Sequence, residues 1–254
     1  MPVRSDLRFF WVLCLIVAPP LLILIELFHP ANFTADPGMF DYLRAPQSPG
    51  GAIDHRALDY FGPNWWFWLH MTQTPAVVLI SAGLMLSVAS FIGRATAPLW
   101  PTVSGWAAVA ALFVFLIYYT VLDAIGGIGL GRTLEAVNLM QADGRLSPDQ
   151  VAGIAVLLDA IWVDPWVGGV GSVVSMTGSW AIFVAAVLAA ITAVLALGFA
   201  GMTALRWLSL VLLIAGGWYV QLSHACCTGP LGFGLIFGFG CLTAWADRNL
   251  GGLD

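Results

Sequence analysis

Residues 65–92 read WWFWLHMTQTPAVVLISAGLMLSVASFI and contain no charged side chain. A helix that crosses a lipid bilayer needs about 20 consecutive apolar residues, so this stretch predicts a membrane-spanning helix. The composition of the whole chain agrees, because hydrophobic residues make up 60% of its 254 residues and charged residues only 9%. A soluble domain usually carries about 25% charged residues. We therefore expect an integral membrane protein with the lipid bilayer as its surroundings.

The same criterion predicts six spans and two long connections. The spans cover residues 7–28, 65–92, 99–122, 178–199, 205–222 and 226–245, and the long connections are 29–64 and 123–177. The predicted fold class is all-α: a single polytopic transmembrane helix bundle over residues 1–254, with short extracytoplasmic helices. One such helix is expected at Ser147-Pro148-Asp149-Gln150, a capping box with proline at the first helical position.

The arginines indicate how the bundle is oriented. Positive residues near the ends of spans favour the cytoplasmic side of a membrane. Five arginines lie close to the span ends that share a side with the N-terminus: Arg4, Arg8, Arg94, Arg206 and Arg248. Both termini are therefore predicted to be cytoplasmic, and the long connections extracytoplasmic. The alanine-rich, lysine-free composition is typical of a bacterial protein, so we expect the bacterial cytoplasmic (inner) membrane.

The composition also excludes several kinds of function. The chain has no lysine and a formal net charge of −5, which excludes lysine Schiff bases and argues against nucleic acid as a partner. Residues 126–131, GGIGLG, have Rossmann-like glycine spacing but follow a predicted membrane helix rather than a strand. No nucleotide site is therefore expected, and we interpret these glycines as a turn at the exit of a helix.

Polar residues gather at the predicted outer ends of four spans. Each span offers a pair spaced by three or four residues, which places both members on one face of a helix: Glu26 with His29, His70 with Gln73, Tyr119 with Asp123, and Gln221 with His224. An unpaired polar group is costly inside an apolar segment. We therefore expect a site at the outer mouth of the bundle, lined by Glu26, His29, His70, Asp123 and His224.

These residue types suit two kinds of cofactor. Imidazole and carboxylate groups together suit a divalent metal ion, whereas the imidazoles of His70 and His224 on separate helices would suit a haem. Glu26-x-x-His29 also has the Glu-x-x-His spacing found in carboxylate-bridged di-metal bundles. In a plainer interpretation the polar groups only satisfy one another, and Asp123 pairs with Arg132.

Two comparisons rest on short stretches of sequence. His224-Ala-Cys-Cys-Thr-Gly-Pro-Leu-Gly resembles the vicinal-cysteine helix of the small mercuric-ion transport proteins, which implies that Cys226 and Cys227 handle a soft metal cation. The runs WWFWLHMTQTP, LDAIGGIGLG and GPLGFG make the chain similar to uncharacterised bacterial six-helix membrane proteins. That second likeness implies no particular activity.

A third comparison concerns an enzyme class. His70, Asp123 and His224 resemble part of the zinc centre of transmembrane metallo-hydrolases, although those enzymes have seven helices and a paired HxxxH motif that is absent here. The resemblance implies a metal-bound water as nucleophile, with Glu26 or Asp123 as the base.

The sequence leaves three functions open. The first is a binding protein or subunit with a metal or haem site at the extracytoplasmic mouth of the bundle. The second is a membrane-embedded metal-dependent hydrolase that acts on a lipid-like substrate. The third is a structural or assembly subunit with no ligand.

Overall fold

The computed structural model describes residues 7–27, 29, 65–97, 99–169, 171–224 and 228–250, without the side chains of residues 65 and 247–250. Within these ranges every regular element is a helix and no strand occurs. Six helical segments are long and apolar enough to cross a membrane: Arg8–Glu26, Trp66–Ile92, Leu99–Ala142, Val173–Leu197, Ala204–Leu222 and Thr228–Ala246. The prediction of an all-α, multi-pass helix bundle is therefore confirmed.

The helices follow one another along the chain with short connections. They are α1 (Arg8–Val12), η1 (Leu13–Val17), α2 (Ala18–Glu26), α5 (Trp65–Ile92), α6 (Leu99–Leu122), η2 (Asp123–Gly129), α7 (Leu130–Ala142), α8 (Pro148–Trp162), α9 (Val173–Leu197), η3 (Phe199–Gly201), α10 (Ala204–Leu222) and α11 (Thr228–Leu250).

Helix α9 begins at Val173, earlier than the residue 178 expected for the fourth span. The reason is an N-cap, because the Ser172 hydroxyl accepts the backbone N–H of Ser175 at 3.2 Å. Such a cap satisfies one of the N–H groups that a helix start leaves without a partner.

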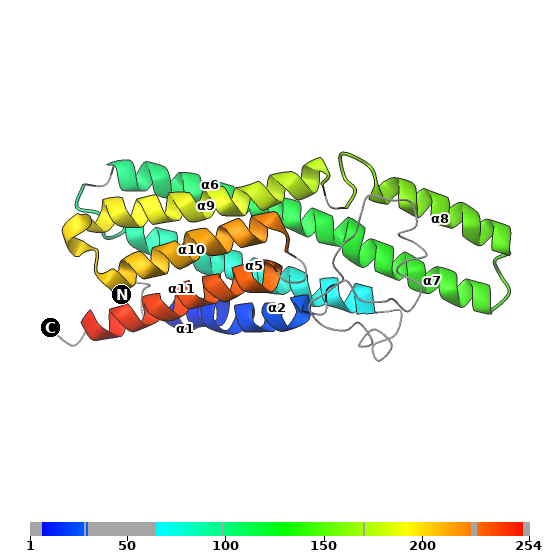
Figure 1. Ribbon diagram of the computed structural model, residues 1–254, viewed down its shortest axis with the longest axis horizontal. Coiled ribbons are helices and arrows are strands. Elements are labelled where there is room, and N and C mark those ends of the chain that lie inside the picture. Colours follow the sequence, from blue (N-terminus) through cyan, green and yellow to red (C-terminus); the bar gives the residue numbers. More distant parts are fainter. Residues whose placement is uncertain are drawn as a thin grey trace.

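The membrane helices form a closed ring. Helix α5 packs on α6, α6 on α9, α9 on α10, α10 on α11, and α11 returns to α2, which itself packs on α5. The start of α1 and the end of α11 lie at one end of the bundle, and the α7–α8 hairpin extends from the other end (Figure 1). Closure of the ring shields the inner faces of all the helices from lipid.

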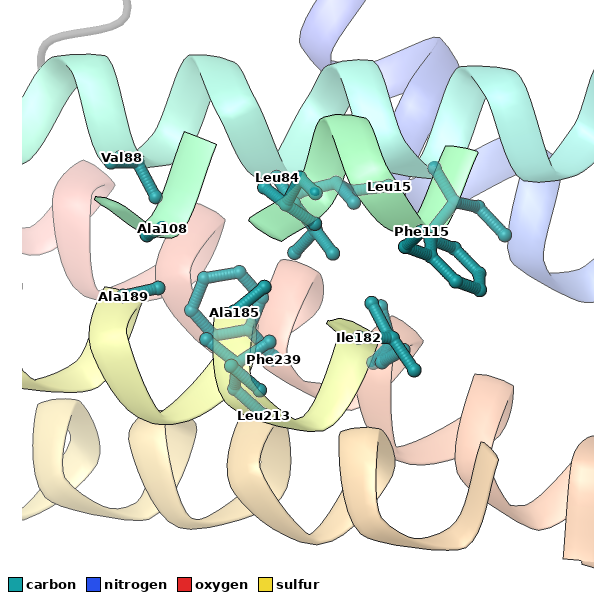
Figure 2. Close-up of a cluster of buried hydrophobic side chains, with 14 of the residues drawn as sticks. Leu15, Leu84, Val88, Ala108, Phe115, Ile182, Ala185, Ala189, Leu213 and Phe239 are labelled. Atoms are coloured by element: carbon teal, nitrogen blue, oxygen red, sulfur yellow. The ribbon is translucent and has the colours of Figure 1, made fainter. Parts of the chain in front are cut away.

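Small side chains on α9 make the ring tight. Ala185, Ala189 and their neighbours at helical spacing are buried, while larger groups such as Phe115 and Phe239 fill the space between helices. These side chains point toward one another from different helices (Figure 2). In lipid, helix association depends on such close van der Waals packing, because no water is released when apolar faces meet.

The third span is a single helix that continues far beyond its expected end. Helix α6 passes through the π-helical segment η2 into α7 without interruption, giving 44 helical residues from Leu99 to Ala142. At 1.5 Å per residue it is about 66 Å long, roughly twice the thickness of the hydrocarbon layer. The turn expected at residues 126–131 is therefore wrong, because these glycines are helical.

The glycines have a different role, which is close packing against the start of α5. A Cβ atom on Gly127 would lie 2.2 Å from Cγ of His70, and one on Gly131 would lie 2.9 Å from the Phe67 backbone. Any side chain at these positions would therefore clash with α5. The sequence pattern reflects the contact between two helices rather than a reversal of the chain.

The α7–α8 hairpin has its own small core. Trp66, Leu134, Val151 and Trp162 are buried together there. The predicted capping box is confirmed: the Ser147 hydroxyl accepts the Gln150 N–H, and the Gln150 side chain accepts the Ser147 N–H at 2.9 Å. The hairpin thus packs directly onto the end of α5 that carries His70.

Replacement of Gly127 tests the close contact between η2 and α5. We expect Gly127→Ala to lower the free energy of unfolding by about 1–3 kcal/mol, because overpacking forces neighbouring groups to shift. The matched control is Gly153→Ala on α8, where a Cβ would meet nothing within 4 Å. There alanine should stabilise the helix by up to about 1 kcal/mol. Thermal unfolding in detergent measures both; equal stability of Gly127→Ala and the parent protein would contradict the contact.

Candidate functional site

One end of the bundle contains a group of buried polar side chains, which we call the histidine–carboxylate cluster. It lies where α2 ends, α5 begins, α6 passes into η2, and α10 ends. The cluster comprises Glu26, His29, His70, Asp123 and His224. Four of these are almost completely buried, with exposed fractions of 0% for Glu26, 3% for His29, 4% for His70 and 1% for Asp123. The five residues that the sequence singled out are thus at the same end of the bundle.

Three imidazole rings are in contact. The ring centroid of His29 lies 5.3 Å from that of His70 and 5.2 Å from that of His224, with the planes steeply inclined to each other. His29 therefore stands beside both of the other rings. The histidines come from the ends of three different helices, so that the fold, and not a local motif, brings them together.

The orientation of His70 is fixed from two sides. Its Nδ1 donates to the carbonyl oxygen of Trp66 at 2.7 Å, and its ring fills the space that the absent side chain of Gly127 leaves open. Trp66 is held in turn, since its Nε1 donates to the carbonyl of Gly126 at 2.9 Å. A proton on Nδ1 leaves the lone pair on Nε2, the nitrogen that binds metals or accepts protons.

The two carboxyl groups have few partners. Asp123 Oδ2 accepts a hydrogen bond from the Thr74 hydroxyl at 2.8 Å. Among the described residues, Asp123 Oδ1 and both carboxyl oxygens of Glu26 have no hydrogen-bond partner. Glu26 and Asp123 are also close enough to repel each other when both are charged. An additional positive charge or a proton must therefore compensate this pair.

Tyr119 connects the carboxylates to the histidines. Its hydroxyl accepts a hydrogen bond from Nε2 of Gln73, and its ring centroid lies 5.4 Å from that of His224. Both Glu26 and Asp123 interact electrostatically with its hydroxyl. Tyr119 and Gln73 are thus part of the same network.

His224 lies just beyond the end of α10 and is half-buried. Burial lowers its pKa to about 4, so the ring is neutral at physiological pH and keeps a lone pair. A small cavity of about 10 Å³ adjoins His224 and Tyr119, with Ser175 and Ser179 of α9 in its wall. A cavity of this size has room for at most one water molecule.

The alternative pairing of Asp123 with Arg132 is wrong. Arg132 forms an ion pair with the half-buried Glu135 of α7, whereas Asp123 accepts a hydrogen bond from Thr74. Asp123 therefore stays in the cluster.

Some sequence predictions lie outside the described residues. Cys226 and Cys227 fall between α10 and α11, and the structure describes neither of them. Sequence reasoning missed Thr74 and Trp66. Thr74 lies four residues after His70 on the same helical face, and this spacing was the available signal.

The cluster does not have the geometry of a formed metal site. Within the described ranges, no group of three or more His, Cys, Asp or Glu side chains stands so that it could hold a metal ion. Comparison of the chain with known protein families, curated proteins and solved structures found no match.

The Thr74–Asp123 hydrogen bond can be tested with an isosteric change. Thr74→Val removes the hydroxyl and leaves Asp123 without its donor, so we expect the free energy of unfolding to fall by about 1–3 kcal/mol. Thr72→Val is the control, because the Thr72 hydroxyl bonds only to the Trp68 carbonyl on an exposed face and should change stability by less than about 0.5 kcal/mol. Equal effects of the two changes in thermal unfolding would count against a role for Thr74 in the cluster.

Proposed function

We propose that this multi-pass membrane protein binds a divalent transition-metal ion at the histidine–carboxylate cluster. The observation that carries the proposal is the burial of two carboxyl groups and three neighbouring imidazoles at one end of an apolar helix bundle. Ionisable groups at such positions are costly and are usually functional. Neutral imidazole and carboxylate oxygen are the ligands that a borderline divalent ion such as Zn²⁺ prefers.

Charge balance favours a cation. Glu26 and Asp123 are buried close to each other, and the nearest arginine along α7, Arg132, is engaged with Glu135. A divalent ion would neutralise both carboxylates at once, and it would give the oxygens of Glu26 the partner that the described residues do not provide.

The spacing of the rings is also compatible with an ion. Imidazoles bound to a tetrahedral ion through bonds of about 2 Å have ring centroids roughly 5 Å apart. The observed separations of 5.3 and 5.2 Å around His29 are of this size. Since His70 is held in place, binding would require the two carboxylates and the rings of His29 and His224 to turn toward its Nε2.

A metal ion fits this arrangement better than a haem does. A haem held by His70 and His224 would need the space beside both of these rings. The ring centroid of His29 lies 5.3 Å from that of His70 and 5.2 Å from that of His224. His29 and a haem held by His70 and His224 would therefore compete for the same space.

Elemental analysis tests the proposal. Protein purified in detergent and equilibrated with Zn²⁺ should retain about one ion per chain and show no Soret absorption band. Glu26→Gln and His70→Ala should lose the ion, because each removes a ligand and leaves the fold of the other helices intact. The matched control is Glu135→Gln, which makes the same change in a half-buried glutamate of α7 that pairs with Arg132 and should leave metal content unchanged.

Thermal unfolding gives a second, independent readout. Zn²⁺ at 100 times its dissociation constant should add about 2.7 kcal/mol to the stability of the parent protein, and nothing to that of Glu26→Gln. A parent protein that neither retains metal nor gains stability would overturn the proposal. The cluster would then be a set of mutually satisfied polar groups in a structural or assembly subunit.

A membrane-embedded hydrolase is the second candidate, because the cavity beside His224 and Tyr119 is about the size of the one water molecule that hydrolysis needs. In that case the ion would supply Lewis-acid activation of water, and Glu26 or Asp123 would act as the general base. The metal-loaded preparation described above separates the two candidates. Release of fatty acid from lipid esters or amides, lost in Asp123→Asn, supports the enzyme; metal retention without any hydrolysis overturns it and leaves a binding protein.

We infer that the cluster faces the extracytoplasmic side of a bacterial cytoplasmic membrane. The inference rests on the positive-inside rule, since Arg8, Arg94 and Arg206 belong to the opposite end of the bundle. Single cysteines at exposed sites, in a protein whose native cysteines are replaced by alanine, test it. Gly153→Cys on α8 should react with a membrane-impermeant maleimide in intact cells, and Ala97→Cys between α5 and α6 only after permeabilisation. The reverse pattern would contradict the orientation.

A further inference from the structure

The end of the bundle opposite the histidine–carboxylate cluster contains a second polar feature. A partly open pocket lies among the ends of α1, α5, α9, α10 and α11. Arg94 and Arg206 line it together with Trp11, Ser87, Ser90 and Thr243. Two guanidinium groups in one pocket are notable in a chain with only nine basic residues.

Each arginine is placed by the end of a helix. Arg206 lies in the first turn of α10, where the Thr203 hydroxyl caps the Arg206 N–H, and its Nη1 donates to the carbonyl of Gly201. Arg94 follows the end of α5, with its backbone N–H bonded to Phe91 at 3.1 Å. Both residues are half-buried. A guanidinium has five N–H donors, so the contact with Gly201 occupies only one of those on Arg206.

The remaining wall is polar on one side and apolar on the other. Trp11 Nε1 donates to the Ser87 hydroxyl at 2.8 Å, and that hydroxyl donates to the carbonyl of Gly83 at 2.9 Å. These bonds hold the polar side chains in place at the pocket. Phe91, Leu197 and Leu210 form the apolar part. The pocket therefore matches a molecule that has an anionic group next to a hydrocarbon portion.

Exposed tryptophans place the pocket at the depth of lipid headgroups. Trp100 near the start of α6, Trp207 near the start of α10 and Trp245 near the end of α11 are all exposed at this end of the bundle. Tryptophan is enriched where a membrane protein meets the headgroup region. The anionic groups that arginines meet at that depth are phosphates, which guanidinium binds with two parallel hydrogen bonds.

We propose that Arg94 and Arg206 bind the phosphate of an anionic phospholipid, whose acyl chains lie along the apolar wall of the pocket. The group that the two arginines would recognise is a phosphate. It could come from a lipid headgroup, as proposed, or from a soluble phosphate ion. The proposal is independent of the metal site, because it concerns the opposite end of the bundle and none of the same residues.

Lipid binding to the purified protein in detergent tests the proposal. Native mass spectrometry or calorimetry should show phosphatidylglycerol bound at least about tenfold more tightly than phosphatidylcholine. Arg206→Gln and Arg94→Gln should each weaken phosphatidylglycerol binding about tenfold or more. The matched control is Arg145→Gln, which removes an exposed arginine paired with Asp143 and should change binding less than about twofold.

The outcomes distinguish the two sources of phosphate. Displacement of phosphatidylglycerol by other anionic phospholipids, but not by inorganic phosphate, supports a lipid site. Saturable binding of inorganic phosphate without selectivity for anionic lipid assigns the pocket to a soluble anion and overturns the lipid proposal. Equal affinity for both lipids, or full binding by Arg206→Gln with unchanged thermal stability, overturns it as well.

Discussion

In hydrocarbon, a polar atom that loses water must find its partner inside the protein, and the rest of this structure follows from that requirement. The backbone satisfies it by remaining helical through long segments, including 44 continuous residues in the third span. Polar side chains meet the requirement for internal partners by lying close to one another. Glu26, His70 and Asp123 are buried together at one end of the bundle instead of being spread along the helices. By the same requirement, a buried carboxyl group that lacks hydrogen-bond partners among the described residues, such as that of Glu26, is the strongest indication of a binding site in the chain.

Close helix contact is the means by which the fold brings these groups together. Gly127 lets the His70 ring fit against η2, and the Trp66 indole bonds to the neighbouring carbonyl of Gly126. The π-helical geometry of η2 begins at Asp123 itself, and π segments within α-helices are frequent at functional sites. Three features thus coincide at the cluster end of the bundle: the π-helical segment, the run of glycines and the buried carboxylate. The opposite end uses different chemistry, with guanidinium and indole groups near the headgroup level.

Composition and apolar run length were sufficient to predict the six spans, since a bilayer imposes its thickness on every crossing segment. The polar pairs were also recognisable, because spacing of three or four residues puts Glu26 beside His29 on one helical face. The helical conformation of residues 126–131 could not be predicted, because glycine is common both in turns and in close contacts between helices. Only the opposing side chain, here His70, decides between the two. Likewise, the bond between Thr74 and Asp123 depends on the rotation of one helix against another, which periodicity does not specify.

The unbroken helix from Leu99 to Ala142 also has a mechanical meaning. Its first part, α6, belongs to the membrane bundle and its last part, α7, to the α7–α8 hairpin (Figure 1), and Asp123 is the first residue of the η2 segment that joins them. A tilt of about 5° at this point moves the far end of α7, roughly 28 Å away, by about 2–3 Å. Because α7 continues directly from η2, which begins at Asp123, a displacement of the hairpin and a displacement of Asp123 are coupled through one helix.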